Sequence, residues 1–576
     1  MFKKLQPQTL VIILTTIAAF LHFYNLNWGA PYYFHPDERN IASAVSQLNF
    51  PIQMNPHFFA YGGFPIYAIY FTGVLFNLLI NFATFTLSGG MYHLVRPGVE
   101  GLNAQLSSPF TVSFSQAIIV SRIFSSLFAT LLIPLLYFIG KKIKDEKTGL
   151  LAAFFATTSV GLIQFSHFGT FEVWLTFFSV LLFLLCLNII EKKTDNLLFG
   201  IGMTLGVLFA TKISHLAILP LPILALALFH VSHHKKLRTL VTSMPDILFV
   251  LLLAFAVFVF ANPFVFSDYT SFASSMKYES EVALGTLKVF YTGAFLSTIP
   301  VLYQFNHIYP FLLNPLLTIL FIPSFLYILF KAVKTKNPSY LFLISFHLLL
   351  FLSQVFLYVK WTRYMVPTLP FVYLVIAIAL PDVIARSTAT KQSRMRLPRS
   401  FQSLAMTVLI LVNVVFAASY FITAFVEPDT RITAREFAQN TIPSDAPILT
   451  EAYDMGVTAF NDSHHNITHF NFYDLDNNSL EYNNETLQEK LTNSQYLVLP
   501  SQRVLKTRLN DSKNFPKGHA FYRALTQGEL NFQKIYETPC SIFCQIAYMG
   551  NPVFTLEETV NVFDRPTVYI YKNSRE

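Results

Sequence analysis

The stretch Asn25–Asn40, NLNWGAPYYFHPDERN, follows the first apolar run of the chain and carries two adjacent carboxylates, Asp37 and Glu38. The apolar run, Thr9 to about Leu26, has close to the length that a bilayer requires. Charges at a membrane boundary usually have a partner or a function. The interpretation of this stretch therefore depends on which side of the membrane the other polar residues occupy.

The composition is that of a polytopic membrane protein. Of the 576 residues 53% are hydrophobic and only 12% are charged, with a mean hydropathy of +0.48; soluble domains carry about 25% charged residues. The net charge of +8 does not indicate a nucleic-acid partner, because the basic residues cluster in short loops between apolar runs. This is the positive-inside pattern of membrane proteins.

The positions of lysine and arginine predict the topology. Lys3 and Lys4 are expected in the cytoplasm, which places Asp37 and Glu38 outside. The apolar runs then give about 11 transmembrane helices in the plasma membrane. Pro65–Phe85 is interpreted as re-entrant or interfacial, because a span there would place the lysines after Gly140 outside. A cleaved signal peptide at the N-terminus is the alternative for the first run.

The chain changes character at Glu427. Residues 1–426 are predicted to form the transmembrane domain, and residues 427–576, which are rich in Asn, Asp, Glu and Thr, a small extracytoplasmic α/β domain. Asp429 is expected to cap a helix. Short strands are expected at Pro447–Thr450, Tyr496–Leu499 and Thr567–Tyr571. Cys540 and Cys544 can bridge in an oxidising compartment, but their spacing alone does not decide this.

Polar residues gather on one face of the predicted topology, at or beyond the outer ends of the spans. Because such positions are costly, their shared sidedness predicts a cavity that opens outward. The residues are Asp37, Glu38, Glu172, Lys212, Asn262, Glu279, Lys360 and Arg363.

Asp37 and Glu38 are the candidate catalytic residues. A carboxylate beside a low-dielectric region can deprotonate a hydroxyl nucleophile. Neighbouring residues do not share a helix face, so one of the two is expected to point at the reacting atom. Two alternatives stay open: a solvated pair with Arg39, or a divalent-cation site that includes His35.

Lys360 and Arg363 form the second cluster. Three residues apart at the start of a predicted helix, they would share a face and form an anion site suited to phosphate. An interfacial belt of cations and aromatics is the alternative. Simpler explanations also exist for Glu172, which can favour a helix dipole, and for Lys212, which can snorkel to the interface.

Several motifs in this order resemble the GT-C superfamily of polyprenyl-phosphate-sugar glycosyltransferases, in particular the branch of the protein O-mannosyltransferases and the lipid A aminoarabinose transferase. The motifs are FHPDERN, YGGFPIY, Arg122 in VSRIFSSLF, SHFGTFEVWLTFF, Lys212 in ATK, and KWTRYMVPTLPF. They extend over roughly residues 1 to 425. Glu172 departs from the Asp that is more frequent in the family.

The resemblance implies roles for the site residues. Asp37 would be the catalytic base, supported by Glu38. Lys360 and Arg363, with Lys212, would hold the lipid phosphate. The expected pocket residues are His35, Tyr61, Glu172, Asn262 and Glu279. No metal ligand is assigned, and a divalent cation bound near Asp37 and Glu38 stays an open alternative.

These residues lead to one hypothesis and three rivals. The hypothesis is an inverting transfer of a sugar from a polyprenyl-phosphate donor to an acceptor hydroxyl of a glycan, lipid or protein outside the cell. A transporter or flippase would instead place charges near the bilayer midplane on repeated, broken helices. A receptor or scaffold leaves both charged clusters unexplained. An oligosaccharide ligase or polymerase of the same superfamily is the third rival.

Overall fold

The computed structural model describes residues 6–87, 110–234, 243–386, 399–452, 460–476, 484–550 and 557–574. Most of the first 426 residues are helical, as expected for a chain whose backbone must satisfy its own hydrogen bonds in lipid. The basic residues Lys3, Lys4, Lys235 and Lys236, and most of the loop before Arg399, lie outside these ranges.

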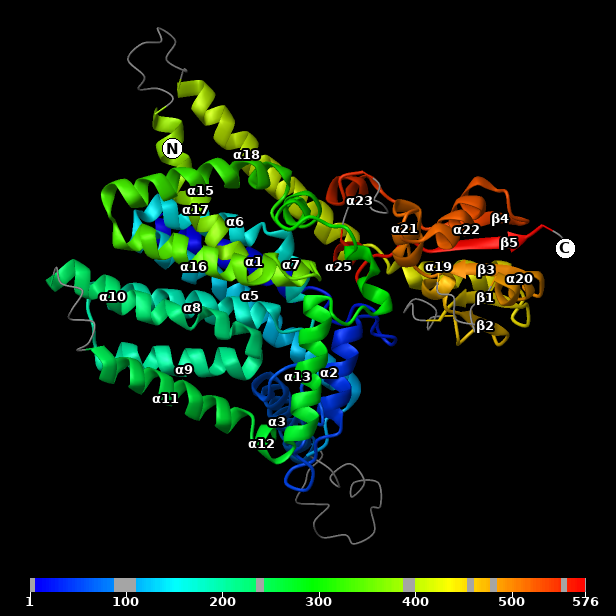
Figure 1. Ribbon diagram of the computed structural model, residues 1–576, viewed down its shortest axis with the longest axis horizontal. Helices are drawn as coiled ribbons and strands as arrows, with labels where there is room; N and C mark the ends of the chain where they lie inside the picture. Colours follow the sequence, from blue (N-terminus) through cyan, green and yellow to red (C-terminus); the bar gives the residue numbers. More distant parts are fainter. Residues whose placement is uncertain are drawn as a thin grey trace.

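The helices of the membrane part form one bundle (Figure 1). They are α1 (Pro7–Phe23), α2 (Pro36–Ser46), α3 (Gly63–Leu87), α5 (Phe114–Ile143), α6 (Glu146–Thr157), α7 (Val160–Ser166), α8 (Glu172–Glu191), α9 (Asp195–Thr211), η1 (Ile213–Ile218), α10 (Pro220–His234), α11 (Met244–Ala261), α12 (Phe264–Ser267), α13 (Tyr269–Leu284), η3 (Phe290–Phe295), η4 (Gln304–Ile308), α14 (Tyr309–Leu312), α15 (Pro315–Thr335), α16 (Pro338–Val355), η5 (Thr362–Thr368), α17 (Leu369–Arg386), α18 (Arg399–Phe421) and η6 (Ile422–Val426).

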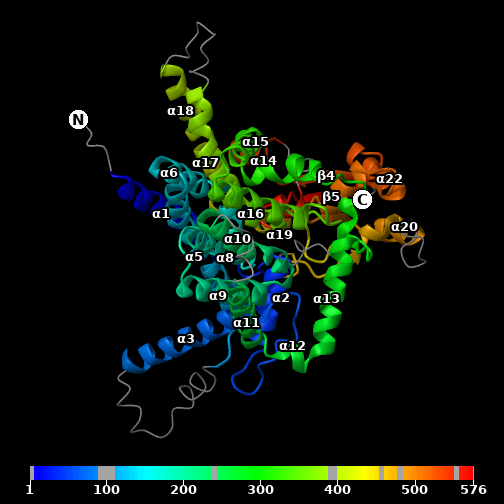
Figure 2. The ribbon, with the colours of Figure 1, turned by 60° about the vertical axis from the view of Figure 1, so that its left-hand side comes forward.

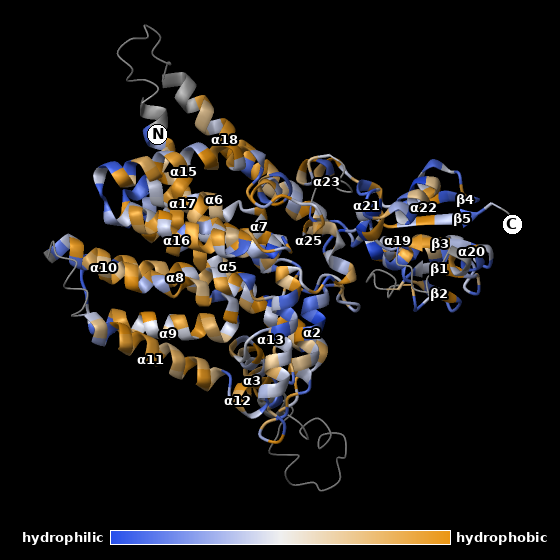
Figure 3. Cartoon of the chain, in the orientation of Figure 1, coloured by the Kyte–Doolittle hydropathy of each residue, from blue (hydrophilic) through white to orange (hydrophobic). Residues whose placement is uncertain are grey.

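The prediction of a multi-span helical membrane protein is confirmed. Within the described residues nine helices are long and apolar enough to cross a membrane, or ten if α6 and α7, which meet at 54°, form one broken span. α1 and α9 are shorter apolar helices. Figure 3 shows the apolar residues concentrated in this bundle. The expected number of about 11 spans includes α1 and α9 but leaves out α3.

α3 takes a different direction from the bundle. Figure 1 views this helix nearly end-on, whereas α8, α9, α10 and α11 run across the picture. Figure 2 shows α3 extending away from the bundle. The residues Gly63–Asn81 are long and apolar enough for a span. The direction of α3, which differs from that of the bundle helices, favours the interfacial interpretation, and this interpretation stays a prediction.

The C-terminal part contains a mixed five-stranded sheet with the order β2-β1-β3-β5-β4. β1 pairs in parallel with β2 and β3, and β5 is antiparallel to β3 and β4. The strands are β1 (Ile448–Glu451), β2 (Ile467–Phe470), β3 (Tyr496–Leu499), β4 (Phe532–Glu537) and β5 (Tyr569–Asn573). The helical elements are α19 (Thr430–Thr441), η8 (Phe472–Asp476), α20 (Asn484–Thr492), α21 (Arg503–Asn510), α22 (Pro516–Gln527), α23 (Ile542–Ala547) and α25 (Glu558–Asn561).

This small α/β fold confirms the expected class. The three predicted strands correspond to β1, β3 and β5, and the side chain of Asp429 caps α19 by accepting a hydrogen bond from the Arg431 amide. The edge strands β2 and β4 were not predicted. β4 has largely exposed or half-buried side chains, so it lacks the apolar run that marks a buried strand.

The end of the chain packs back onto the helical bundle. Tyr548, Val560 and Phe563 are buried in the same apolar cluster as the membrane helices. A disulfide joins Cys540 and Cys544 beside α23, which packs against α18. The predicted boundary between residues 426 and 427 therefore separates two parts that share a core.

Candidate functional site

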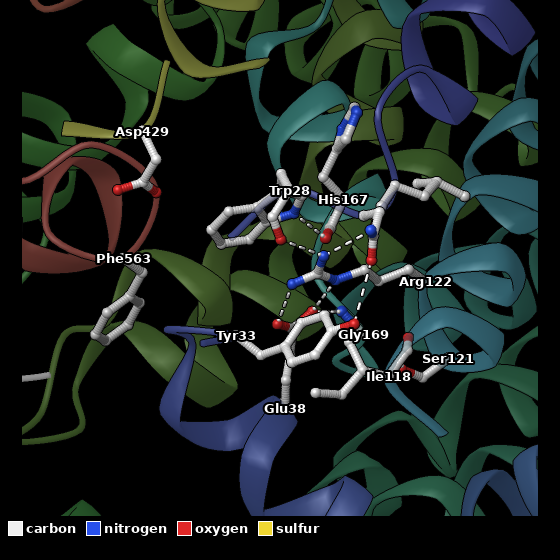
Figure 4. A network of polar contacts seen from close by, with 12 residues as sticks. Trp28, Tyr33, Glu38, Ile118, Ser121, Arg122, His167, Gly169, Asp429 and Phe563 are labelled. Carbon is white, nitrogen blue, oxygen red and sulfur yellow. Dashed lines mark hydrogen bonds and ion pairs between the residues drawn. The ribbon is translucent and has the colours of Figure 1, made fainter. Parts of the chain in front are cut away.

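The site begins with α2, whose position is fixed by a buried ion pair. Arg122 on α5 is fully buried and binds both carboxylate oxygens of Glu38, with N–O distances of 2.8 and 2.7 Å. Its Nη1 also donates to the carbonyl oxygens of Leu26 and Trp28, and the guanidinium lies 4.4 Å from the Trp28 ring centre. Figure 4 shows this network. The loop before α2 and the helix itself are thus held by one arginine.

Gly169 completes this anchor. Its amide donates to Oε1 of Glu38, and a Cβ at this position would lie 2.0 Å from Oγ of Ser121. Only glycine allows so close an approach. Breaking such a buried pair by removing one partner costs about 3–5 kcal/mol. Glu38 therefore has a structural role as the partner of Arg122.

Asp37, the next residue on α2, faces a different partner. Its Oδ2 forms an ion pair with Nη1 of Arg363 at the start of η5. Burial favours the protonated form of Asp37, but the charges of Arg363, His35 and Lys212 outweigh burial and lower the pKa of Asp37 below its ordinary value. The two adjacent carboxylates thus bind different arginines; that one of them points at the reacting atom stays a prediction.

The YGGF segment brings Tyr61 to the end of α9. The Gly62 amide donates to the carbonyl oxygen of Thr211 at 2.9 Å, and the Gly63 amide donates to Oδ1 of Asn262 at 2.6 Å. A Cβ on Gly62 would lie 1.9 Å from the carbonyl oxygen of Ala210. Both glycines therefore permit the backbone to touch the ends of neighbouring helices.

Lys212 follows directly after α9 and lies between two tyrosines. Its Nζ is 5.4 Å from the ring centre of Tyr61 and 5.3 Å from that of Tyr364. The faces of the two rings attract the ammonium group but carry no negative charge that would compensate it. Electrostatic interactions also link Lys212 to Glu172, Glu279 and Asp37.

A cavity adjoins the two cations Lys212 and Arg363, whereas Asp37, Tyr61 and Glu279 are not among its lining residues. It encloses about 450 Å³, including space open to solvent, and Glu172, Lys212, Arg363 and Tyr364 are among its lining residues. The others come mainly from η1 and α16 and include His215, Ile218, Leu350 and Gln354. Two cations and an apolar wall suit a ligand with an anionic head and an apolar tail.

Glu279 on α13 contributes a carboxylate to the same charged group. It interacts electrostatically with Lys212, Arg363 and Asp37, and desolvation of its carboxyl group by the surrounding protein raises the pKa of Glu279 above its ordinary value. Figure 1 shows α13 beside α2, at the end of the bundle that faces the C-terminal sheet.

His35 lies outside the cavity wall, between two aromatic rings. Its ring centre is 4.5 Å from that of Phe168 and 4.7 Å from that of Phe563 in the C-terminal part. Burial lowers the pKa of His35. This histidine therefore packs the residue before α2 against the C-terminal part, rather than lining the pocket as expected.

Lys360 and Asn262 also differ from their expected positions. Lys360 precedes η5, which begins at Thr362, so it does not share a helix face with Arg363. Its Nζ donates to the carbonyl oxygen of Tyr358 at 2.9 Å. Asn262 caps α11 and holds Gly63. Neither residue lines the cavity.

The three residues considered for a divalent cation are separated by their partners. Glu38 binds Arg122, Asp37 binds Arg363, and His35 lies between rings. Within the described ranges, no three His, Cys, Asp or Glu side chains come together as a potential metal site.

Two C-terminal residues reach the site and were not predicted from the sequence. The guanidinium of Arg431 lies 3.8 Å from the ring centre of Phe34, just before His35. Glu557 accepts a hydrogen bond from the amide of Thr362 at 3.0 Å, just before Arg363. The first contact joins residues 397 positions apart and the second joins residues 195 positions apart, and no local pattern signals them.

Comparison with known families places part of this chain. The model of the dolichyl-phosphate-mannose-protein mannosyltransferase family matches residues 108–261. The resemblance to the GT-C glycosyltransferases is confirmed. The matched region, about a quarter of the chain, contains Arg122, Glu172 and Lys212, whereas Asp37 and Arg363 lie outside it.

Two solved structures match nearly the whole chain at low identity. An oligosaccharyltransferase from Archaeoglobus fulgidus has 11% identity and a TM-score of 0.49, over 99% of this chain and 89% of that chain. ArnT from Cupriavidus metallidurans, bound to undecaprenyl phosphate, has 10% identity and a TM-score of 0.44, over 98% and 97%. At these scores they add nothing to the family match. A search of curated proteins found no match.

Proposed function

We propose that this protein transfers a sugar from a polyprenyl-phosphate donor to an acceptor hydroxyl at the outer face of the membrane. The observation that carries the proposal is the cavity in which Lys212 and Arg363 lie beside an apolar wall, with Asp37 bound to Arg363. A lipid phosphate would place its charge on the two cations. Its chain would follow the apolar residues.

The reaction uses the two sides of the ion pair. Asp37 accepts the proton of the acceptor hydroxyl, whose oxygen attacks the anomeric carbon. The bond between that carbon and the phosphate oxygen breaks, and the polyprenyl phosphate leaves with its negative charge on Arg363 and Lys212. A base on one side and a leaving group on the other give inversion. Lys360 is not part of this proposal, because it neither lines the cavity nor, like Asp37, pairs with a lining residue; its Nζ donates to the carbonyl oxygen of Tyr358.

The outer location is supported by the Cys540–Cys544 disulfide. Disulfides persist in oxidising compartments and are rare in the cytoplasm. Figure 1 shows the C-terminal sheet at the end of the bundle where α2 and α13 lie. At the opposite end Lys144 and Lys331 bind Asp382, as expected for a face rich in lysine.

The test is the release of polyprenyl phosphate from a set of short-chain polyprenyl-phosphate sugars, in membranes that contain the wild type, Asp37→Asn or Arg363→Ala. We expect both substitutions to reduce turnover at least about a hundredfold, the scale of losing a general base or an electrostatic stabiliser. Lys277→Ala is the control, since Lys277 is an exposed residue of α13. Wild-type turnover in both site variants would exclude the mechanism.

A further inference from the structure

Glu557 is a buried carboxylate that the proposed reaction does not use. It has 2% of its surface exposed, and it lies at the N-terminal end of α25 in the C-terminal part of the chain. Oε2 accepts hydrogen bonds from the amides of Thr559, at 3.2 Å, and Thr362, at 3.0 Å. Oε1 has no hydrogen-bond partner within the described residues.

The first of these bonds is ordinary helix capping, but the second is not. A carboxylate commonly caps its own helix by accepting from the amide two residues on. The Thr362 amide belongs to η5, 195 positions earlier in the chain. Burying a carboxylate is costly, and burial raises the pKa of Glu557. Capping of α25 does not explain why this carboxylate is buried and accepts a second bond from Thr362.

Thr362 is the residue directly before Arg363. A bond that fixes its amide also fixes the direction in which the next side chain leaves the backbone. The guanidinium of Arg363 lies 4.4 Å from the ring centre of Trp361, and its Nη1 binds Asp37. Its Nε has no hydrogen-bond partner in the described part of the chain. The Tyr364 ring centre lies 5.9 Å from the guanidinium. The side chain thus depends for its position on its backbone, one ion pair and two rings.

We infer that Glu557 is a positioning residue, which holds the Thr362–Arg363 backbone so that the guanidinium faces the cavity. This inference rests on the proposed function, because it assigns the held arginine to the lipid phosphate. Through Glu557 the C-terminal part of the chain becomes a component of the phosphate site. Phe563, six residues later, contacts His35 on the Asp37 side, so one short segment touches both halves of the site.

Three substitutions separate the length of the side chain from its charge. Glu557→Asp keeps the charge and a good helix cap but is too short to reach Thr362. Glu557→Gln keeps the length and an acceptor oxygen. Glu557→Ala removes both. Glu558→Ala is the matched control, since Glu558 is the adjacent residue and pairs with Arg503 in the C-terminal part.

The experiment measures binding of a short-chain polyprenyl phosphate to the full-length protein in detergent, together with the melting temperature. We expect Glu557→Asp and Glu557→Ala to weaken binding roughly tenfold, the value of one hydrogen bond. Glu557→Gln and Glu558→Ala are expected to bind within about twofold of the wild type. In an Arg363→Ala background, Glu557→Asp is expected to have no further effect.

Each contrary result has a separate meaning. Wild-type binding by Glu557→Asp and Glu557→Ala would overturn this inference while Arg363→Ala still shows the phosphate site. An equal loss in Glu558→Ala, or a further loss in the Arg363→Ala background, would also overturn it, because the effect would then reflect general stability. Wild-type binding by Arg363→Ala would overturn the proposed function itself.

Discussion

The ion pair between Asp37 and Arg363 joins the proposed base to the residue proposed to bind the phosphate. In this state neither group is free for its reaction. A phosphate that binds Arg363 must compete with Asp37, and its arrival would release the carboxylate for the acceptor. Because the pKa of Asp37 is lowered, the stability that the pair contributes is present above the ordinary pKa of an aspartate and is lost as the pH falls through the lowered value.

This competition gives a prediction for binding. Asp37→Asn should abolish transfer. It should nevertheless bind a short-chain polyprenyl phosphate about three- to tenfold more tightly than the wild type, because it removes a competing interaction worth about 0.5–1.5 kcal/mol. Titration of the purified variant in detergent measures this. Asp246→Asn is the control, since Asp246 pairs with Lys193 at the other end of the bundle. Unchanged or weaker binding would contradict the competition.

Single residues were predictable where a charge interrupts an apolar run. Asp37, Glu172, Lys212 and Arg363 were identified in this way, and the structure brings all four into one charged group. Lys360 was misplaced because the facing argument assumed a regular helix from that residue onward. The short helix η5 begins two residues later, and sequence periodicity does not locate such a boundary.

At the scale of elements, the two glycines of the YGGF segment allow three parts of the fold to meet. They place the start of α3 against the ends of α9 and α11, and so place Tyr61 beside Lys212. The sequence motif was recognisable from family resemblance. Its physical reason, the close approach of backbone to backbone, becomes visible only when the neighbouring helices are in place.

Gly62→Ala tests this packing. The new Cβ would lie 1.9 Å from the carbonyl oxygen of Ala210, so the segment must move away from Lys212. We expect a loss of about 1–3 kcal/mol of stability, typical of overpacking, seen as a lower melting temperature, and at least about tenfold weaker phosphate binding.

Gly200→Ala is the matched control for that variant. Gly200 lies within α9, and its added Cβ would meet Leu185 at 3.4 Å, an ordinary contact. Alanine is also the better helix former, so this variant should melt at or above the wild-type temperature. Equal losses in the two variants would show that crowding near the YGGF segment is not special.

For the whole molecule, composition and the distribution of lysine and arginine were enough to predict a multi-span helical protein with a small C-terminal α/β part. The contacts of Arg431 with Phe34 and of Glu557 with Thr362 could not be predicted, because they depend on how two distant parts of the chain dock. A sequence of one protein contains no periodic signal for such contacts.

The orientation of the whole molecule is testable with cysteine labelling. The native chain offers little background, since Cys186 is buried and Cys540 is bound to Cys544. Lys513 in the C-terminal part and Lys334 at the end of α15 are both exposed. On intact cells a membrane-impermeant maleimide should label Lys513→Cys and leave Lys334→Cys unlabelled until the membrane is permeabilised. The reverse pattern would place the site in the cytoplasm.

Tyr548, Val560 and Phe563 are buried among the membrane helices. Their burial limits whether the C-terminal part can be exchanged for that of another protein. A chimera made by cutting at residue 427 would remove side chains from the core of the bundle along with the C-terminal sheet. A donor domain would have to supply matching apolar side chains and a carboxylate at the Thr362 amide. Changes in surface loops should therefore disturb the fold less than replacement of the whole C-terminal part.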